Sequence, residues 1–397
     1  MQVKRETTEP GTPALLRTLN QRALLERLRR DGPLSRADLA RRSGLSKPTV
    51  SQALAGLEEA GLVRAVGPAA PSRGRTGMLY EPDPTAGYVV GIDIGRAWIR
   101  VAVADLAGTV AGRSDTRNRA RSAENVVRTA ATQARAVVAE AGVRWSRIVH
   151  TVVGSPGVFD PATGRLWHAP NLPGWSKPGL AGQLRDALTP SIAIYNDANL
   201  AAVGERDFGV GRDVDSFVWI ELGTGVGVGI IIGGELYPGA RGAAGEVAYV
   251  PLPGDRRPGR SGRGTLEEAT SAAAVVTSAK RAGMRGQLTA KRVFDAARVG
   301  DTKALEAVKA EADRVALLVA TLAAVVDPEL VVLGGGVGGN LDLLNPRLEE
   351  RLRQLTPLET TIVQSELGQD AIVLGAIATA LNTAREAVFE SRLVASS

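Results

Sequence analysis

The sequence predicts an α/β protein in which a winged helix-turn-helix unit precedes a larger body of two related lobes. Three helical patterns and a strand–loop–strand follow one another in the first 80 residues. From residue 88, short β-branched runs alternate with glycine turns and helices, as in a fold rich in βαβ units. A strand–turn–strand device then occurs twice, which indicates two lobes. We expect the winged unit over residues 1–80, a linker over 81–87 and the body over 88–397.

Composition limits the sites and the compartment that we expect. With 397 residues, of which 44% are apolar, the chain is long enough for two or three domains with sizeable cores. It contains no cysteine and only two histidines, which excludes disulfides and thiolate metal sites and predicts no metal site. The N-terminus lacks the apolar stretch of a signal peptide, and no uninterrupted apolar run of about 18 residues occurs. These features predict a cytoplasmic protein with no membrane partner.

The net charge of +6 is concentrated near the N-terminus. Residues 1–80 contain 14 Lys and Arg against 7 Asp and Glu, whereas the rest of the chain is close to neutral. A basic segment on a neutral body indicates a polyanion partner for that segment alone. A solvated basic face would give the same pattern.

Local capping signals define three helices in the basic segment. The first helix is predicted over residues 19–30. The second opens at Ser35, a favourable N-cap residue, and ends near Gly44. The third is predicted over residues 47–60, directly after a second N-cap residue, Ser46.

The third helix has the pattern of a recognition helix. Val50, Leu54 and Leu57 form a buried stripe, which leaves polar residues exposed near the helix N-terminus, where groove-reading side chains lie. Residues 61–64 and 78–80 predict two strands around an arginine-containing loop, which is a β-wing. The alternative is a helical bundle for protein interaction. The predicted DNA-binding residues are Arg36, Ser46, Lys47, Thr49, Ser51, Gln52, Arg73 and Arg75.

Three glycine turns follow strands of the predicted body. They are Asp93-Ile94-Gly95, Leu222–Gly227 and Gly334-Gly335-Gly336. Backbone N–H groups in such a turn can cradle a phosphate, although a single example is more often only a tight turn. Three turns in this order are more informative than any one alone.

Five further motifs keep the order found in the ROK family (repressors, open reading frames, kinases), which the chain resembles over nearly its whole length. The motifs are Gly154-Ser155-Pro156-Gly157, Ala169–Trp175, Asn196-Asp197-Ala198-Asn199, Gly242–Glu246 and Gly264-Thr265-Leu266-Glu267. The resemblance implies that the body has the two-lobed actin/hexokinase-like ATPase fold. It also implies that the winged unit marks the regulator branch of the family.

The resemblance places a sugar site in the body. In the kinases of the family, the aspartate at Asp197 acts as general base on the attacking hydroxyl. Carboxylates and amides suit a sugar because they form several hydrogen bonds at fixed angles. The residues implied are Asn171, Asn196, Asp197, Glu246, Tyr249 and Glu267.

Several of these residues also have a structural interpretation. Asp197 precedes a helical run and can serve as its N-cap, and Glu246 can face solvent after its glycine turn. Glu267 opens a helix, where the helix dipole stabilises a carboxylate. Asn171 can be an ordinary turn residue.

The first phosphate loop departs from the kinase pattern. Family kinases have Asp-x-Gly-Gly-Thr, whereas this chain has Arg96 and Ala97 after Gly95. A side chain at Arg96 obstructs the approach of a phosphate to the backbone, and a positive φ there would be strained. We therefore expect vestigial phosphate loops, no cofactor and no kinase activity. The vestigial loop residues are Asp93, Gly95, Gly223, Thr224 and Gly225.

The zinc site of the family is also missing. Tyr249 occupies the position of a histidine, and residues 259–265 replace a cysteine-rich stretch without any cysteine. The tyrosine can donate a hydrogen bond to the sugar or stack on its apolar face.

Together these observations predict a sugar-responsive transcriptional regulator, a repressor of carbohydrate metabolism genes. A homodimer or homotetramer would present two recognition helices to a two-fold operator in double-stranded DNA. Sugar binding would move the lobes and reposition the winged units through residues 81–87. Two alternatives remain: an active ATP-dependent sugar kinase with an appended DNA-binding domain, and a regulator that has lost ligand control.

Overall fold

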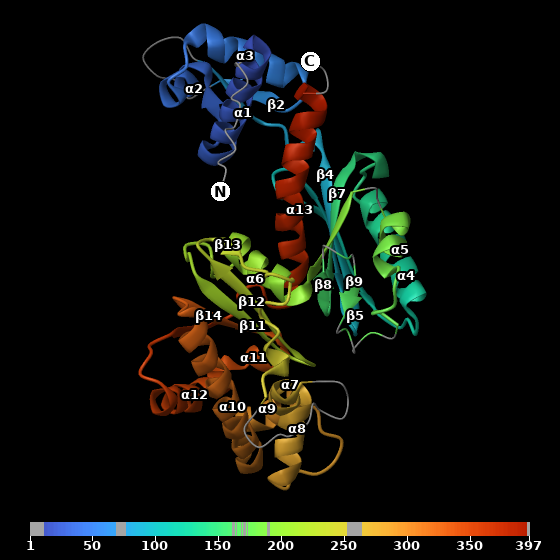
Figure 1. Cartoon of the computed structure of the whole chain (residues 1–397), viewed down its shortest axis with the longest axis vertical. Coiled ribbons are helices and arrows are strands. Elements are labelled where there is room, and N and C mark those ends of the chain that lie inside the picture. The colour runs from blue at the N-terminus through green and yellow to red at the C-terminus, as the bar shows by residue number, and fades with distance from the viewer. Residues whose placement is uncertain are drawn as a thin grey trace, which may run out of the picture.

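The computed structural model describes residues 12–68, 77–160, 163, 165–167, 169, 172, 174–188, 191–251 and 264–394. Figure 1 shows the winged unit at one end of the long axis, the first lobe in the middle and the second lobe at the other end. One long helix, α13 (Ala371–Phe389), runs from the region between the lobes up to the winged unit.

The winged unit contains three helices and a three-stranded sheet of order β1-β3-β2. Helix α1 begins before the predicted residue 19, because Thr12 caps it by accepting the N–H of Leu15 and Pro13 occupies its first position. Ser35 and Ser46 cap α2 and α3 as predicted. The elements are α1 (Pro13–Asp31), β1 (Leu34–Ser35), α2 (Arg36–Ser43), α3 (Lys47–Glu59), β2 (Val63–Pro68) and β3 (Met78–Pro82).

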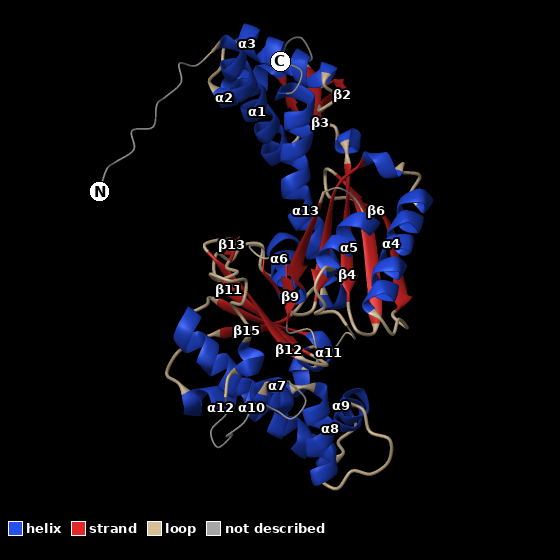
Figure 2. Cartoon of the chain, turned by 45° about the vertical axis from the view of Figure 1, so that its right-hand side comes forward, coloured by secondary structure: helices blue, strands red, loops and turns tan. Residues whose placement is uncertain are grey.

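The first lobe has a five-stranded sheet of order β10-β7-β4-β5-β6. Alternate residues of β4 face opposite sides, so that Val89 packs with α13 and Val90 packs with α4. Helices α4 and α5 therefore cover one face and α13 the other (Figure 2). The elements are β4 (Tyr88–Ile94), β5 (Trp98–Asp105), β6 (Val110–Arg117), α4 (Ala123–Glu140), β7 (Ile148–Ser155), β8 (Val158–Asp160), β9 (Arg165–Trp167), α5 (Leu180–Ala187) and β10 (Ile192–Asn196).

The second lobe has a five-stranded sheet of order β13-β12-β11-β14-β15. Helix α6 (Asp197–Phe208) links the first lobe to it. Its strands are β11 (Phe217–Leu222), β12 (Val226–Ile232), β13 (Glu235–Leu236), β14 (Leu330–Gly334) and β15 (Thr361–Gln364). Its helices are α7 (Thr265–Thr270), α8 (Ala272–Arg281), α9 (Ala290–Arg298), α10 (Thr302–Val326), α11 (Gly335–Gly338) and α12 (Leu341–Leu355).

The two lobes share a strand arrangement. In the first lobe, β4 pairs with β5 in antiparallel and with β7 in parallel orientation. In the second lobe, β11 pairs with β12 in antiparallel and with β14 in parallel orientation. The prediction of two related α/β lobes is therefore confirmed.

Helices α6 and α13 approach each other at the level of the backbone. A Cβ atom on Gly375 would lie 1.7 Å from the carbonyl oxygen of Leu200, and one on Gly204 would lie 2.2 Å from that of Ala371. Because real side chains never come so close, glycine is required at both positions. The contact fixes α13 against the helix that begins with Asp197.

The same helix lies in a long and largely apolar segment. The segment Gly368–Leu393 is long and apolar enough to cross a membrane, with a mean hydropathy of 1.3. In the structure, 56% of this window is buried, and α13 packs on α6, β4 and β7. Its apolar surface thus forms part of the protein core.

We predict that Gly375→Ala lowers the free energy of unfolding by about 1–3 kcal/mol, because the added methyl group forces α6 and α13 apart. Thermal or denaturant unfolding measures this change. The matched control is Gly182→Ala in α5, where an added Cβ meets no atom within 4 Å. This control should be neutral or more stable by up to about 1 kcal/mol. Equal stability of the two variants would contradict the close packing.

Candidate functional site

Acidic side chains from both lobes face one another where the lobes meet. Asp197 begins α6 directly after β10. Three further carboxylates lie close enough for their charges to act on it: Glu221 near the end of β11, Asp93 in β4 and Glu246. Glu246 in turn lies near Glu267, which is buried in the first turn of α7. The structure therefore brings three predicted sugar-binding carboxylates together, with two further carboxylates beside them.

Burial and mutual repulsion raise the pKa values of these groups. Burial, then the charges of Glu221, Asp93 and Glu246, raise the pKa of Asp197 to about 8. Burial raises the pKa of Glu221 to about 7, and burial with the charge of Glu267 raises that of Glu246 to about 6. A carboxyl group that keeps its proton can donate as well as accept a hydrogen bond, which suits a ligand rich in hydroxyl groups.

Asn196 and Asp197 have different tasks at the start of α6. Asn196, and not Asp197, is the N-cap: its Oδ1 accepts the backbone N–H of Asn199, and its Nδ2 donates to the carbonyl oxygen of Gly157 at 3.1 Å. The structure thus gives Asn196 a structural use. Asp197 Oδ1 accepts the N–H of Ala198 at 2.9 Å, which fixes the carboxylate at the helix N-terminus.

Tight glycine packing brings Glu246 and Glu267 together. Gly245 has φ +87°, and a Cβ on it would lie 2.0 Å from the carbonyl oxygen of Val228 in β12. A Cβ on Gly264 would lie 1.7 Å from the carbonyl oxygen of Ala248. The turn before Glu246 therefore packs against β12, and the start of α7 packs against residues 248–249, which follow Glu246.

Tyr249 lies beside this carboxylate pair. Burial and then the charges of Glu246 and Glu267 raise the pKa of its hydroxyl. The side chain is 38% exposed, which leaves part of it open to a ligand. Asn171, the remaining predicted sugar-binding residue, lies outside the described residues.

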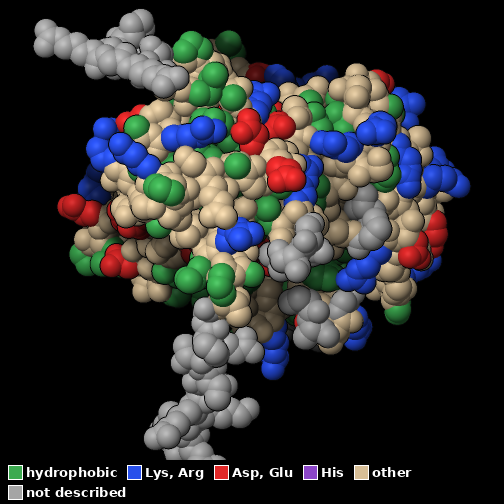
Figure 3. Space-filling view, turned by 90° about the horizontal axis from the view of Figure 1, so that it is seen from above, with side chains coloured by type: hydrophobic (Ala, Val, Ile, Leu, Met, Phe, Trp, Pro, Cys, Tyr) green, Lys and Arg blue, Asp and Glu red, His purple; other side chains and the backbone are tan. Residues whose placement is uncertain are grey.

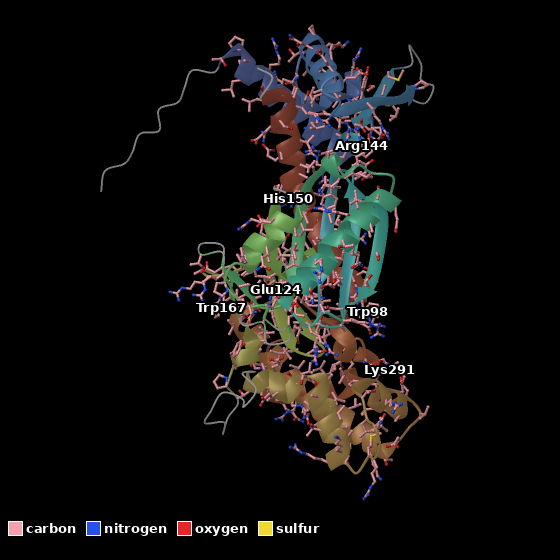
Figure 4. The ribbon with its side chains drawn as sticks, turned by 90° about the vertical axis from the view of Figure 1, so that its right-hand side faces the viewer. Trp98, Glu124, Arg144, His150, Trp167 and Lys291 are labelled. Carbon is pink, nitrogen blue, oxygen red and sulfur yellow. The ribbon has the colours of Figure 1, made fainter. Side chains whose placement is uncertain are left out.

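The first glycine turn is bridged by an internal backbone hydrogen bond. The N–H of Gly95 donates to the carbonyl oxygen of Trp98 at 2.9 Å, and Arg96 and Ala97 are exposed. Among the residues described, Asp327 is the only non-glycine residue with positive φ, so the strain expected at Arg96 is absent. The turn has become an ordinary hairpin turn. Figure 4 shows Trp98 at the end of the first lobe that faces the second lobe.

Arg100 is a site residue that the sequence analysis missed. The antiparallel register of β4 and β5 places it opposite Asp93, and its Nη1 donates to Asp93 Oδ2 at 2.9 Å. Its Nη2 donates to Gln369 Oε1 at 2.7 Å, and Gln369 lies in the short helical turn directly before α13. Burial nevertheless raises the pKa of Asp93 to about 6. The only sign of this role in the sequence is that Arg100 is a charged residue within a predicted apolar strand.

Metal ligands are scarce in the described part of the chain. No group of three or more His, Cys, Asp or Glu side chains there is placed to hold a metal ion. His150 lies beside Ser191, with its Nδ1 2.6 Å from the serine Oγ, and Figure 4 shows it far from the second lobe.

The winged unit exposes the polar start of α3. Ser46, Lys47, Ser51 and Gln52 are exposed, and Thr49 is partly buried. The hydroxyls of Ser46 and Thr49 lie 2.8 Å apart within the helix cap.

The other predicted DNA contacts lie on α2 and the wing. The Arg36 guanidinium lies 5.1 Å from the centre of the Tyr80 ring. Arg73 and Arg75 lie outside the described residues. Figure 3, which looks onto this end of the molecule, shows many Lys and Arg side chains and fewer Asp and Glu.

The end of α13 and the π-helical segment Glu390–Val394 that continues it contact the winged unit. Arg392 donates to the carbonyl oxygens of Ala60, which caps α3, and Gly61, at 3.0 and 2.9 Å. Arg22 of α1 forms an ion pair with Glu386 at 2.6 Å. The helix therefore has one end at the carboxylate cleft and the other at the base of the recognition helix.

Comparison with known proteins places the body in a family. Residues 89–383 match the model of the ROK family. The chain belongs to the ROK family. Residues 17–74, in the winged unit, match the model of the MarR family.

Two kinds of ROK relative are similar to the chain. A xylose repressor of Caldicellulosiruptor bescii is 26% identical over 386 residues, covering 93% of this chain and 96% of the relative. A glucokinase of Thermotoga maritima is 33% identical over 242 residues, covering 56% of this chain and 76% of the enzyme. A solved ROK family transcriptional regulator, described as a homologue of the E. coli MLC protein, has a TM-score of 0.76 at 20% identity and covers 96% of this chain and 99% of its own. The repressor and the solved regulator thus span both the winged unit and the body.

We predict that Asp197→Asn raises the free energy of unfolding near pH 8 by about 1–2 kcal/mol. Because the folded pKa lies above the unfolded one, the folded chain holds the proton more tightly, and stability falls as the pH rises from about 4 to about 8. Because asparagine does not ionise, the variant should not lose this stability as the pH rises. Thermal unfolding across that range measures it, with the exposed Asp186→Asn as control. A pH profile of Asp197→Asn that matches wild type would show that the carboxylate is not perturbed.

Proposed function

We propose that this ROK protein is a sugar-responsive, DNA-binding repressor of carbohydrate metabolism genes that binds its sugar without phosphorylating it. The observation that carries this proposal is the physical link between the two sites. The segments that flank α13 contact the acidic cleft through Gln369 and the C-terminal end of the recognition helix through Arg392. The xylose repressors among the relatives support the same function.

The sugar site is proposed between the lobes. Asp197, Glu246 and Glu267 would bind sugar hydroxyls, and Tyr249 would cover one side of the ring. Asn171 would add a contact, and Asn196 would act by holding Asp197 in place. Asp197 would then serve as a ligand-binding residue and not as a general base.

The DNA site is proposed on the winged unit, with residues 1–80 as the DNA-binding domain, 81–87 as a linker and 88–397 as the sensor. From the exposed start of α3 in the major groove, Gln52 would read a base edge, and Lys47 and Ser51 would hold DNA phosphates. Arg36, Ser46, Thr49, Arg73 and Arg75 would contact the backbone or the minor groove. A cytoplasmic homodimer or homotetramer would place two such helices on one operator.

Closure of the lobes would reach the DNA site along α13 as well as through the linker. The cleft end of the helix moves with Arg100 and Gln369, and the far end carries Arg392 against the base of α3. A sugar needs only a different affinity for the two arrangements, on the order of 1–3 kcal/mol, to control DNA binding.

A second candidate is an active sugar kinase with an appended DNA-binding domain. The glucokinase relatives and the retained Asp197 favour it. The closed first glycine turn, with Arg96 and Ala97 in place of glycine and threonine, opposes it. An ATP-coupled assay across a sugar panel separates the two, since turnover abolished by Asp197→Asn would establish the enzyme.

We predict that one or more monosaccharides raise the melting temperature of the protein and change its affinity for operator DNA. The operator is first selected from random duplexes, and anisotropy then measures affinity with and without each sugar. Lys47→Ala should weaken DNA binding and lower the slope of log affinity against log salt by about one. Lys291→Ala in the second lobe should leave the DNA affinity and its salt dependence unchanged. A sugar that stabilises the protein without altering DNA affinity would contradict the proposed control.

We predict that Arg392→Ala keeps sugar binding but loses most of the effect of sugar on DNA affinity, because the contact of α13 with Ala60 and Gly61 is gone. Calorimetry measures sugar binding, and anisotropy measures DNA affinity in both states. Arg353→Ala, on the exposed side of α12, is the control. Full sugar control in Arg392→Ala would rule out transmission through this contact.

A further inference from the structure

The second glycine turn contains a carboxylate of the chain itself. Glu221 immediately precedes the turn Leu222–Gly227. Its Oε1 atom lies 2.8 Å from the position that a Cβ atom would take on Gly223, and 2.8 Å from the corresponding position on Gly335. Gly335 belongs to the third glycine turn, at the end of β14. The carboxylate oxygen therefore lies between the two turns that the sequence marks as possible phosphate cradles.

Two backbone donors of the glycine turns already have acceptors within their own turns. The N–H of Gly223 donates to the carbonyl oxygen of Gly225 at 3.0 Å, within the second turn. The N–H of Gly95 donates to Trp98 in the first turn. A cradle binds phosphate through free N–H groups that point at the anion, and these two are satisfied internally.

The local charge also disfavours a phosphate. Glu221 shares the cleft with Asp93 and Asp197: after burial, the charge of Asp93 raises the pKa of Glu221, and the charges of Glu221 and Asp93 raise the pKa of Asp197. The positive charge of Arg100 acts on Glu221, but Arg100 already pairs with Asp93 at 2.9 Å. A nucleoside triphosphate would bring further negative charge against unpaired carboxylates, which costs affinity unless a cation is added.

We propose that Glu221 is the residue that excludes nucleotides: its carboxylate fills the space between the second and third glycine turns, so that the cleft accepts a neutral sugar and rejects nucleoside triphosphates. This inference rests on the proposed function and names the group that makes the cleft a receptor. Arg96 and Ala97, by contrast, are exposed in a hairpin turn. Replacing these two residues with the glycine and threonine of the kinases would leave Glu221 in place.

The test compares two repaired proteins in the full-length chain. The first carries Arg96→Gly and Ala97→Thr, and the second adds Glu221→Ser. Binding of Mg-ATP is measured by calorimetry and by displacement of a fluorescent ATP analogue. The first protein should bind no better than wild type, and the second should bind at least about tenfold more tightly, as expected when a like charge is removed. Equal affinity of the two proteins, or tight binding by wild type, would overturn the assignment.

Glu221→Ala provides a second route if the serine variant does not fold. It removes both the volume and the charge of the carboxylate, and in the repaired background it too should gain Mg-ATP binding over the repaired protein with Glu221. No gain would overturn the assignment. Sugar-induced stabilisation and operator binding are measured on the wild-type preparation alone, so failure of the nucleotide result is distinguishable from failure of the proposed function.

Discussion

The backbone contact between α6 and α13 is the constraint on which the rest of the structure depends. Gly204 and Gly375 allow the two helices to touch without intervening side chains. One helix begins with Asp197 in the acidic cleft, and the other continues into the segment Glu390–Val394, whose Arg392 contacts the C-terminal end of the recognition helix. Because packed interiors deform little, a shift of one helix must be followed by the other. A continuous chain of contacts therefore joins the cleft to the winged unit.

The cleft combines features of a receptor with remnants of an enzyme. Its carboxylates are buried close together, so that their pKa values rise and the folded state loses stability when they ionise. Such a cost is typical of a binding site, where a ligand restores the missing partners. The glycine turns survive in the sequence, yet the N–H groups of Gly95 and Gly223 bond within their turns, and Glu221 lies between the second and third turns. Sugar recognition and loss of nucleotide binding are compatible in one fold.

Local features of the chain could be predicted from the sequence, and distant contacts could not. The caps at Ser35 and Ser46 depend on residues three positions away, and both were predicted correctly. The bonds from Arg100 to Gln369 and from Arg392 to Ala60 join residues 269 and 332 positions apart, so no local pattern reveals them. Asn196 and Glu221 show the same limit, because only the folded chain shows that one caps a helix and that the other enters a glycine turn.

The absence of cysteine makes the coupling directly measurable, because spin labels can be attached to single introduced cysteines without background. Exposed positions serve for this: Glu58 in the winged unit, Asp186 in the first lobe and Lys291 in the second. Electron–electron distance measurements then follow two pairs, lobe to lobe and winged unit to first lobe, with and without a sugar that stabilises the protein. Coupling through α13 predicts that both distance distributions shift together. A shift between the lobes that leaves the winged unit unmoved would contradict it.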